Sequence, residues 1–399
     1  MLLADRLQKI SPSLTLAITA KAALLKSQGH DILSLGAGEL DIDTPVFIKE
    51  AGIAAIHKGY TKYTAVDGIL DLKKAIQKKF QDENKLSYDL NEITVNCGAK
   101  HSIFNALYAT LNPEDEVIIP TPYWVSYESI VQMMDAIPVL VPCPENDGFK
   151  LTAATLEKAI TTKTKWLILN SPSNPTGAIY TKAELENLAT VLRKHPNIYI
   201  LSDDIYEHVI YPPHQFYTLA TLAPDLKDRI LIVNGVSKCF SMTGWRIGYA
   251  AGPVALIKAI NILQSHSTSN PCSISQYAAL EGLKEGVGFL KEPLKELESR
   301  RNYVVESLNT IPGIQCALPE GAFYVYPSCK GLMGKKTPKG QCIESDTDFA
   351  TYLLEEALVA VVPGIAFGLS PYFRISYATD METLQKACIR IHRACDQLI

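Results

Sequence analysis

The sequence predicts an α/β fold built around a mostly parallel β-sheet. Short apolar runs rich in Val, Ile and Leu recur through the middle of the chain, and each ends in turn or polar residues. Segments with helical spacing separate several of these runs, and strands that alternate with helices indicate βαβ units and a parallel sheet. Uninterrupted apolar runs such as WLIL (166–169) and ILIV (230–233) suit strands covered on both faces.

The expected strands of this sheet are EITVNC (92–97), DEVIIP (115–120), IPVLVP (137–142), KWLILN (165–170), IYILSD (198–203) and RILIVNG (229–235). Helical spacing is clearest in HSIFNALYATL (101–111) and KAELENLATVLRKH (182–195), which lie between these strands. The order of the elements is therefore that of a sheet with crossover helices.

The pattern changes after about Gly286. An amphipathic segment at 289–311 predicts a long helix that crosses from one domain to the next. Beyond it come the strand-like stretch AFYVYP (322–327), the apolar residues 350–364, the strand-like YFRISYA (372–378) and a closing helical pattern. This part of the chain is expected to fold separately from the large sheet.

Two domains are expected, because 399 residues exceed the size at which one hydrophobic core keeps growing. The predicted division is a large domain at 46–285 and a smaller one formed by 1–45 together with 286–399. Residues 11–28 predict a helix that could close over a bound substrate as a lid. The apolar residues expected on one face of that helix are Leu16, Ala20, Ala23 and Leu24.

Composition narrows the possible functions. Hydrophobic residues make up 47% of the chain and charged residues 20%, as in an ordinary globular protein. A net charge of −4 argues against a nucleic-acid-binding surface as the main function. No apolar run is long enough to span a bilayer, so we expect no membrane partner and a cytoplasmic location. The nine cysteines form no metal-binding cluster, which predicts free thiols and no metal site.

Polar and aromatic residues follow five of the expected strands, where ligands bind in open α/β sheets. These positions are the turn 98–100, the aromatic pair 123–124, the amide-rich turn 170–174, the carboxylate Asp203 and the pair 237–238. Each feature alone is commonplace. Together they suit a phosphorylated aromatic aldehyde.

Lys238 stands among small and apolar neighbours, which suggests a site shielded from water. Burial lowers the pKa of an amine, and a neutral lysine condenses with an aldehyde to form a Schiff base. Arg246 and the Ser237 hydroxyl would bind a phosphate, helped by free backbone N–H groups at the turn CGAK (97–100). A lysine beside a buried strand and a plain strand-to-helix turn are the ordinary alternatives.

Asp203 is expected at a buried strand end, where its carboxylate could pair with a protonated pyridine nitrogen. Its neighbour Asp204 is expected to face solvent, since alternate residues of a strand point to opposite sides. Tyr206 and Asn174 carry polar groups able to hydrogen-bond a ring hydroxyl, and Trp124 could stack on the ring or belong to the core.

SKCFSMTGWRIG (237–248) resembles the lysine signature of class I pyridoxal-phosphate aminotransferases of fold type I. LGAGELDIDTP (35–45), GAKHS (98–102), SPSNPTG (171–177) and SDDIYEH (202–208) resemble that family in the same order along the chain. TKYTAVDG (61–68), TPYWVSY (121–127), MTGWRIGYAAGP (242–253) and VVPGIAF (361–367) are most similar to the bacterial aspartate aminotransferase subgroup. The resemblance implies a mostly parallel seven-stranded sheet flanked by helices, with a smaller α+β domain.

The resemblance also implies roles for individual residues around pyridoxal 5'-phosphate. Lys238 would carry the cofactor as a Schiff base and move the proton at the substrate Cα. The ring would be held by Asp203, Asn174, Tyr206 and Trp124. The phosphate would be held by Ala99, Lys100 (through its backbone), Ser237 and Arg246. Tyr63 would reach the phosphate of a neighbouring subunit, which implies a homodimer with shared active sites.

The implied reaction moves an amino group between an L-amino acid and a 2-oxo acid. Arg374, assisted by the Gly38 backbone, would bind the substrate α-carboxylate; a salt-bridged strand arginine is the alternative. Substrate binding would also involve Trp124 and Asn174. In the bacterial subgroup a lysine matching Lys100 binds the distal carboxylate, with residues matching Ser13 and Thr15 nearby. L-Aspartate with 2-oxoglutarate and oxaloacetate is therefore the expected substrate set.

Other functions share some of these sequence features. Aromatic, prephenate or broad-specificity transamination fits the same motifs, although Ser11 stands where prephenate-using relatives tend to carry lysine. The fold also supports β-lyases, so fold alone does not decide. A regulatory protein would need an added DNA-binding module, for which the chain has no spare residues. A dinucleotide enzyme is disfavoured because no G-x-G-x-x-G follows the first strand.

Overall fold

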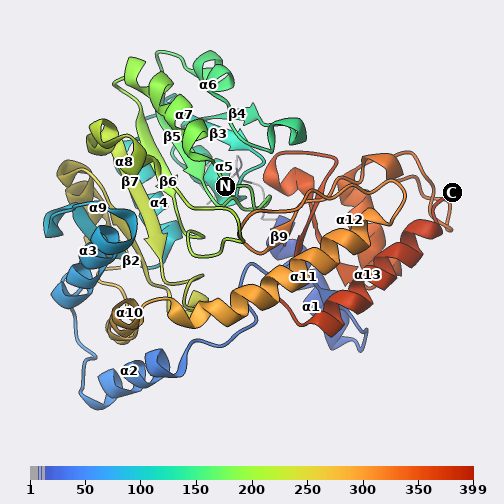
Figure 1. Ribbon diagram of the computed structural model, residues 1–399, viewed down its shortest axis with the longest axis horizontal. Coiled ribbons are helices and arrows are strands. Elements are labelled where there is room, and N and C mark those ends of the chain that lie inside the picture. Colours follow the sequence, from blue (N-terminus) through green and yellow to red (C-terminus); the bar gives the residue numbers. More distant parts are fainter. Residues whose placement is uncertain (1–7, 9, 11–13) are drawn as a thin grey trace.

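The structure is a computed structural model that describes residue 8, residue 10 and residues 14–399. Its centre is a seven-stranded sheet in the order β2-β8-β7-β6-β5-β3-β4 (Figure 1). The strands are β2 (Ile93–Asn96), β3 (Glu116–Thr121), β4 (Ile137–Pro142), β5 (Thr164–Asn170), β6 (Tyr199–Asp203), β7 (Ile230–Gly235) and β8 (Gly248–Ala251). All six expected strands are confirmed.

β8 was not expected from the sequence, and it is the one strand of this sheet that runs antiparallel to both neighbours, β2 and β7. Its four residues, GYAA, include no β-branched side chain, so they carry little strand signal. Small residues are needed there, because a Cβ on Gly248 would lie 2.2 Å from the backbone nitrogen of Ala99. β8 therefore packs directly against the start of helix α4 (Ala99–Thr110), which follows β2 in the chain.

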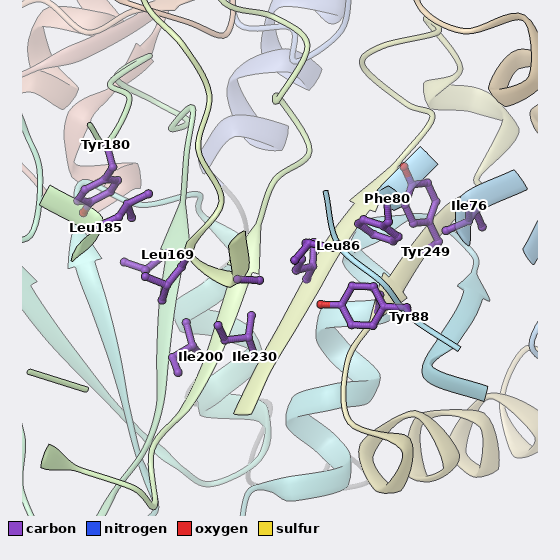
Figure 2. Packing of buried hydrophobic residues seen from close by; sticks show 14 of the residues in the cluster. Ile76, Phe80, Leu86, Tyr88, Leu169, Tyr180, Leu185, Ile200, Ile230 and Tyr249 are labelled. Atoms are coloured by element: carbon purple, nitrogen blue, oxygen red, sulfur yellow. The ribbon is translucent and has the colours of Figure 1, made fainter. Parts of the chain in front are cut away.

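One face of the sheet is covered by helices α3 (Leu70–Asn84), α7 (Lys182–Lys194) and α10 (Ser273–Glu285). Ile76 and Phe80 of α3 meet Tyr249 of β8 in this layer, and Leu185 of α7 meets strand residues such as Leu169 (Figure 2). The short helices α6 (Ala153–Ala159) and α8 (Leu219–Leu222) lie on the same side of the fold.

The opposite face is covered by α4 (Ala99–Thr110), α5 (Ser126–Met133) and α9 (Val254–His266). The two faces use alternate residues of the same strand: Val117 and Ile119 of β3 face these helices, and Ile118 faces the other layer. This period of two explains the uninterrupted apolar runs, since side chains on both faces of the central strands are buried.

The smaller part of the fold contains a three-stranded antiparallel sheet and a two-stranded parallel sheet. Their strands are β1 (Leu33–Ser34), β9 (Tyr324–Val325), β10 (Val359–Ala360), β11 (Val362–Pro363) and β12 (Phe373–Ser376). The pairing of β1 with β10 joins the N-terminal segment to the C-terminal part, as expected.

Helices surround these small sheets. They are α1 (Leu14–Ser27), α11 (Lys291–Asn309), α12 (Asp346–Glu356) and α13 (Met381–Asp396), while α2 (Val46–His57) packs on α10. α11 is the long helix expected at 289–311, and it runs from the region of the large sheet towards α13 (Figure 1). The proposed domain boundaries stay a prediction.

α1 packs through a different face from the one expected. Ile18, Ala22 and Leu25 contact the C-terminal part, whereas Leu24 is 57% exposed and Ala20 and Ala23 are also exposed. The side chain of Leu16, the fourth residue of the expected face, lies outside the described part of the structure. The helical spacing allowed either apolar stripe, and contact with α12 and β10 selects this one.

All nine cysteines are unpaired, and six of them are buried. Among the described residues, no helix combines the length and the apolar character needed to cross a membrane.

Candidate active site

A cavity of about 470 Å³ opens where the parallel strands β5, β6 and β7 end. Its wall contains Gly38, Ala99, Lys100, Trp124, Asn174, Asp203, Tyr206, Ser237, Lys238, Arg246 and Arg374. These predicted residues are distant in sequence. Those that follow β5, β6 and β7 meet because adjacent parallel strands end at the same edge of the sheet, whereas Arg374 comes from β12 of the three-stranded sheet. Their individual roles stay predictions.

Lys238 lies shortly after β7 and is half-buried in the cavity wall. Its Nζ donates a hydrogen bond to the carbonyl of Gly38, while the nearby carboxylate of Glu39 accepts one from the Thr243 hydroxyl at 2.7 Å. Burial is the main cause that lowers the pKa of the Lys238 amine to about 8, and it outweighs the opposing charge of Glu39. A substantial fraction of the amine is therefore neutral in mildly alkaline solution.

The lowered pKa of Lys238 predicts how stability depends on pH in the cofactor-free protein. An unfolded lysine keeps its proton up to about pH 10.5, whereas the folded one loses it near pH 8. Between these values the unfolded state binds more protons, so the free energy of unfolding should rise with pH relative to that of Lys238→Met. Urea denaturation of both proteins at pH 8 and pH 10 measures this, and parallel pH profiles would contradict it.

Asp203 ends β6 and is buried beneath the cavity. Its Oδ2 accepts a hydrogen bond from the Tyr127 hydroxyl at 2.5 Å, and its Oδ1 accepts one from the Ile205 N–H at 3.4 Å. Burial raises the pKa of the Asp203 carboxyl to about 6, partly offset by these hydrogen bonds and by Lys238. A buried carboxylate in this state favours a cationic partner in the cavity.

Asp204 does not face solvent, so that prediction is wrong. Only 3% of Asp204 is exposed, and its Oδ1 accepts a hydrogen bond from the Ser202 hydroxyl at 2.7 Å. The side of the sheet opposite the cavity is covered by helices rather than water. Burial accordingly raises the pKa of the Asp204 carboxyl well above its ordinary value.

A group of side chains with metal-ligand chemistry lies on this covered side, where atoms of Glu83, Glu207 and His208 approach within 4.8 Å of one another. Lys79 contacts Glu207 directly in a buried ion pair, and Asn234 Nδ2 donates to the same carboxylate at 2.6 Å. These donors already satisfy the central carboxylate, so the cluster is an ion-pair network.

An anion-binding cradle forms where α4 begins. Gly98, at φ +87°, turns the chain into α4, and a Cβ at this position would lie 2.4 Å from the Arg246 guanidinium. The backbone of Ala99 and the side chains of Ser237 and Arg246 line the same part of the cavity. Backbone N–H groups at a helix start, a hydroxyl and a guanidinium together suit a phosphate.

Arg374, on β12, is 3% exposed and also lines the cavity. Its Nη1 donates to Asn174 Oδ1 at 2.8 Å, and its Nη2 donates to the Gly36 carbonyl at 2.7 Å. Within the described part of the chain its Nε has no hydrogen-bond partner. Among the residues that the structure describes, no acidic side chain forms an ion pair with Arg374. A buried guanidinium with an unpaired N–H suits a bidentate anionic ligand.

A family model described as "Aminotransferase class I and II" matches residues 30–391. The chain belongs to this family.

Individual relatives agree with this assignment over the full length. A protein of Rickettsia bellii named probable aspartate/prephenate aminotransferase is 56% identical and is covered completely, as is this chain. The crystal structure of aspartate aminotransferase from Rhizobium meliloti superposes with a TM-score of 0.97 at 54% identity, with 100% of each chain covered. The Thermus thermophilus aspartate aminotransferase with maleate gives a TM-score of 0.92 at 40% identity, over 98% of this chain and 99% of that one.

Three of the predicted residues are not placed in the cavity of this aminotransferase. Tyr63 is 90% exposed and lines a separate surface depression with residues such as Thr268 and Cys272. Ser13 lies outside the described residues, as does Ser11, and the side chain of Thr15 in α1 is not described.

The cavity of the aminotransferase also contains residues that the sequence interpretation did not select. The Tyr127 hydroxyl donates a hydrogen bond to the Asp203 carboxylate, and Asn170 Nδ2 donates one to the Asp203 backbone carbonyl at 2.9 Å. Tyr324 and Thr19 line the cavity wall. Tyr127 and Asn170 stand in motifs already noted, beside Trp124 and Asn174. Tyr324 comes from a two-residue strand with no comparable signal.

Proposed function

We propose that this aminotransferase transfers the amino group of L-aspartate to 2-oxoglutarate, and back from L-glutamate to oxaloacetate, with pyridoxal 5'-phosphate as its cofactor. The observation that carries the proposal is the convergence of Lys238, Asp203 and Arg374 in one cavity beside an anion-binding cradle. The names of full-length relatives, aspartate and aspartate/prephenate aminotransferase, support the same substrate.

The residues present fit this cofactor. The start of α4 with Ser237 and Arg246 offers a phosphate site, and Asp203 is a buried carboxylate whose raised pKa of about 6 favours a cationic ring nitrogen. Asn174 and Tyr206 offer polar groups for the ring hydroxyl. When bound, pyridoxal phosphate supplies an aldehyde and an electron-withdrawing ring.

Lys238 performs the proton transfer in this proposal. Its lowered pKa of about 8 leaves a neutral amine able to take the proton from the substrate Cα and return it elsewhere. Arg374 holds the α-carboxylate through its guanidinium, and the Gly38 backbone supports the same end of the substrate. Arg374 is only 3% exposed, and its burial excludes water and strengthens its interaction with the carboxylate.

Lys100 selects the distal carboxylate of the substrate. Its Nζ lies 4.8 Å from the centre of the Trp124 ring in the cavity wall, and burial lowers the pKa of this amine. The Thermus thermophilus relative was crystallised with maleate, a dicarboxylate. We propose that Ser13 and Thr15 assist Lys100. Because one ammonium discriminates less sharply than a guanidinium fork, aromatic substrates or prephenate remain the second candidate.

A homodimer with shared sites completes the proposal. Tyr63 is 90% exposed, and neighbouring residues of and near α2 are apolar and exposed: Val46 (67%), Ile53 (45%), Ile56 (53%) and Tyr60 (41%). Such a patch suits a subunit interface. We propose that the partner subunit's Tyr63 reaches the phosphate cradle. The proposed enzyme has two domains, one formed by residues 46–285 and the other by residues 1–45 together with 286–399. Helix α1 acts as a lid over the cavity in this proposal. The nine unpaired cysteines suit a protein of the cytoplasm.

An absorbance titration tests the proposed function. The purified protein with pyridoxal phosphate should show a visible band that L-aspartate removes and oxaloacetate restores. Loss of the band with aromatic amino acids but not with aspartate would keep the chemistry and overturn the substrate. Absence of any band after addition of cofactor would overturn the role of Lys238.

Lys100→Ala should raise the Michaelis constant for aspartate more than that for phenylalanine, because only the dicarboxylate uses the ammonium. An expected difference of about 10-fold corresponds to one charge-assisted contact. Steady-state kinetics with both amino donors measures it, and Lys74→Ala, at an exposed position of α3, is the matched control. Equal losses for both donors would instead implicate Lys100 in cofactor binding.

A further inference from the structure

Tyr324 contacts two functional groups of the cavity at once. It is fully buried on β9, and its hydroxyl lies 2.9 Å from the hydroxyl of Tyr206. The guanidinium carbon of Arg374 lies 4.4 Å from the centre of the Tyr324 ring. β9 pairs with β12, which carries Arg374, so the small sheet fixes both side chains relative to each other.

The hydrogen bond between the two tyrosines has a direction that follows from the proposed function. Each phenol has one hydrogen to donate. If Tyr206 donates its hydrogen to the cofactor ring oxygen, it must accept the hydrogen of Tyr324. Donors in such a chain polarise one another, so Tyr324 makes Tyr206 a stronger donor.

The aromatic ring of Tyr324 contacts the second functional group, the Arg374 guanidinium. Arg374 lies between Tyr324 and Phe367, whose ring centre is 4.9 Å from the guanidinium carbon. Aromatic faces at this distance attract a cation and keep the planar guanidinium in one orientation. Gly38 permits this arrangement, because a Cβ there would lie 3.2 Å from the Tyr324 hydroxyl.

We propose that Tyr324 is a positioning residue that strengthens the Tyr206 hydrogen bond through its hydroxyl and orients Arg374 through its ring. This inference rests on the proposed function of the cavity. It separates into two parts, because the hydroxyl and the ring can be removed one after the other.

Tyr324→Phe removes the hydroxyl and keeps the ring. The pH midpoint of the visible band of the bound cofactor should rise by about 0.1–0.7 of a pH unit, because a weaker donor stabilises the anionic ring oxygen less. The dissociation constant of maleate should change less than about twofold, since the ring beneath Arg374 remains.

Tyr324→Leu removes the ring as well, and the dissociation constant of maleate should rise by about 3- to 30-fold. Tyr377→Phe is the matched control, since Tyr377 donates to the Tyr211 hydroxyl at 3.0 Å in a buried tyrosine pair outside the cavity wall. Tyr377→Phe should change neither the pH midpoint of the visible band nor the dissociation constant of maleate, although it removes a similar hydrogen bond.

Several outcomes would overturn the inference. If the pH midpoint of the visible band is unchanged in Tyr324→Phe, the hydroxyl has no such role. If Tyr324→Phe and Tyr324→Leu weaken maleate binding equally, the ring has no such role. A midpoint shift of the same size in Tyr377→Phe would mean a general structural effect. A wild-type protein without a visible band would overturn the proposed function itself, and this inference with it.

Discussion

Lys238→Ala should abolish transamination while the protein still binds pyridoxal phosphate non-covalently. The substitution removes the amine that moves the proton, whereas the phosphate cradle at Arg246 and the carboxylate of Asp203 remain. General acid–base catalysis alone contributes about 10²–10⁴-fold, and loss of covalent attachment adds to it. The measurement is the rate of a single half-reaction with aspartate, followed by absorbance.

Two controls sharpen the Lys238 experiment. Lys74→Ala removes an exposed lysine of α3 and should leave the rate unchanged. Fluorescence or dialysis should show that Lys238→Ala still retains the cofactor, which separates lost chemistry from lost binding. Substantial turnover by Lys238→Ala would contradict the assignment of Lys238 as the base.

Arg374→Ala should weaken substrate binding by about 2–5 kcal/mol, the usual cost of removing one member of a buried charge pair. The guanidinium is buried beside the rings of Tyr324 and Phe367, and its loss removes the cation that would bind the carboxylate. The effect should appear in the Michaelis constants of all amino acids, since every substrate carries the α-carboxylate.

Arg374→Lys is the matched variant for this experiment. It keeps the charge but loses the two-pronged geometry that bonds Asn174 and Gly36, so it should recover only part of the affinity. Cofactor affinity should be measured in parallel, because Asn174, which accepts a hydrogen bond from Arg374, is also proposed to contact the cofactor ring. An unchanged Michaelis constant for every substrate would refute the carboxylate role.

The sequence was sufficient to predict the central sheet because its strands are long, apolar and buried on both faces. Their order along the chain also predicted which edge would gather Lys238 and Asp203. β8 escaped prediction because it has only four residues and no β-branched side chain, and the strands of the smaller sheets are mostly two residues long. Such elements are defined by their partners rather than by their own pattern.

The surroundings of individual side chains were harder to predict than the helices and strands on which they lie. Alternation along β6 correctly placed Asp204 on the other side from Asp203, but not the helices that bury it. Helical spacing predicted α1 but did not predict which of its apolar stripes would pack against other residues. Tyr324 was missed because its importance depends on contacts with Tyr206 and Arg374, which are distant in sequence.

The hydrogen bond from Lys238 to the Gly38 carbonyl has a consequence for the ease with which the amine changes partner. A carboxylate acceptor would hold the amine as an ammonium ion, but Glu39 instead accepts from Thr243. A neutral carbonyl accepts a hydrogen from the charged and the uncharged amine alike. Lys238 can therefore leave its resting position without separating an ion pair, and it can return there in either protonation state.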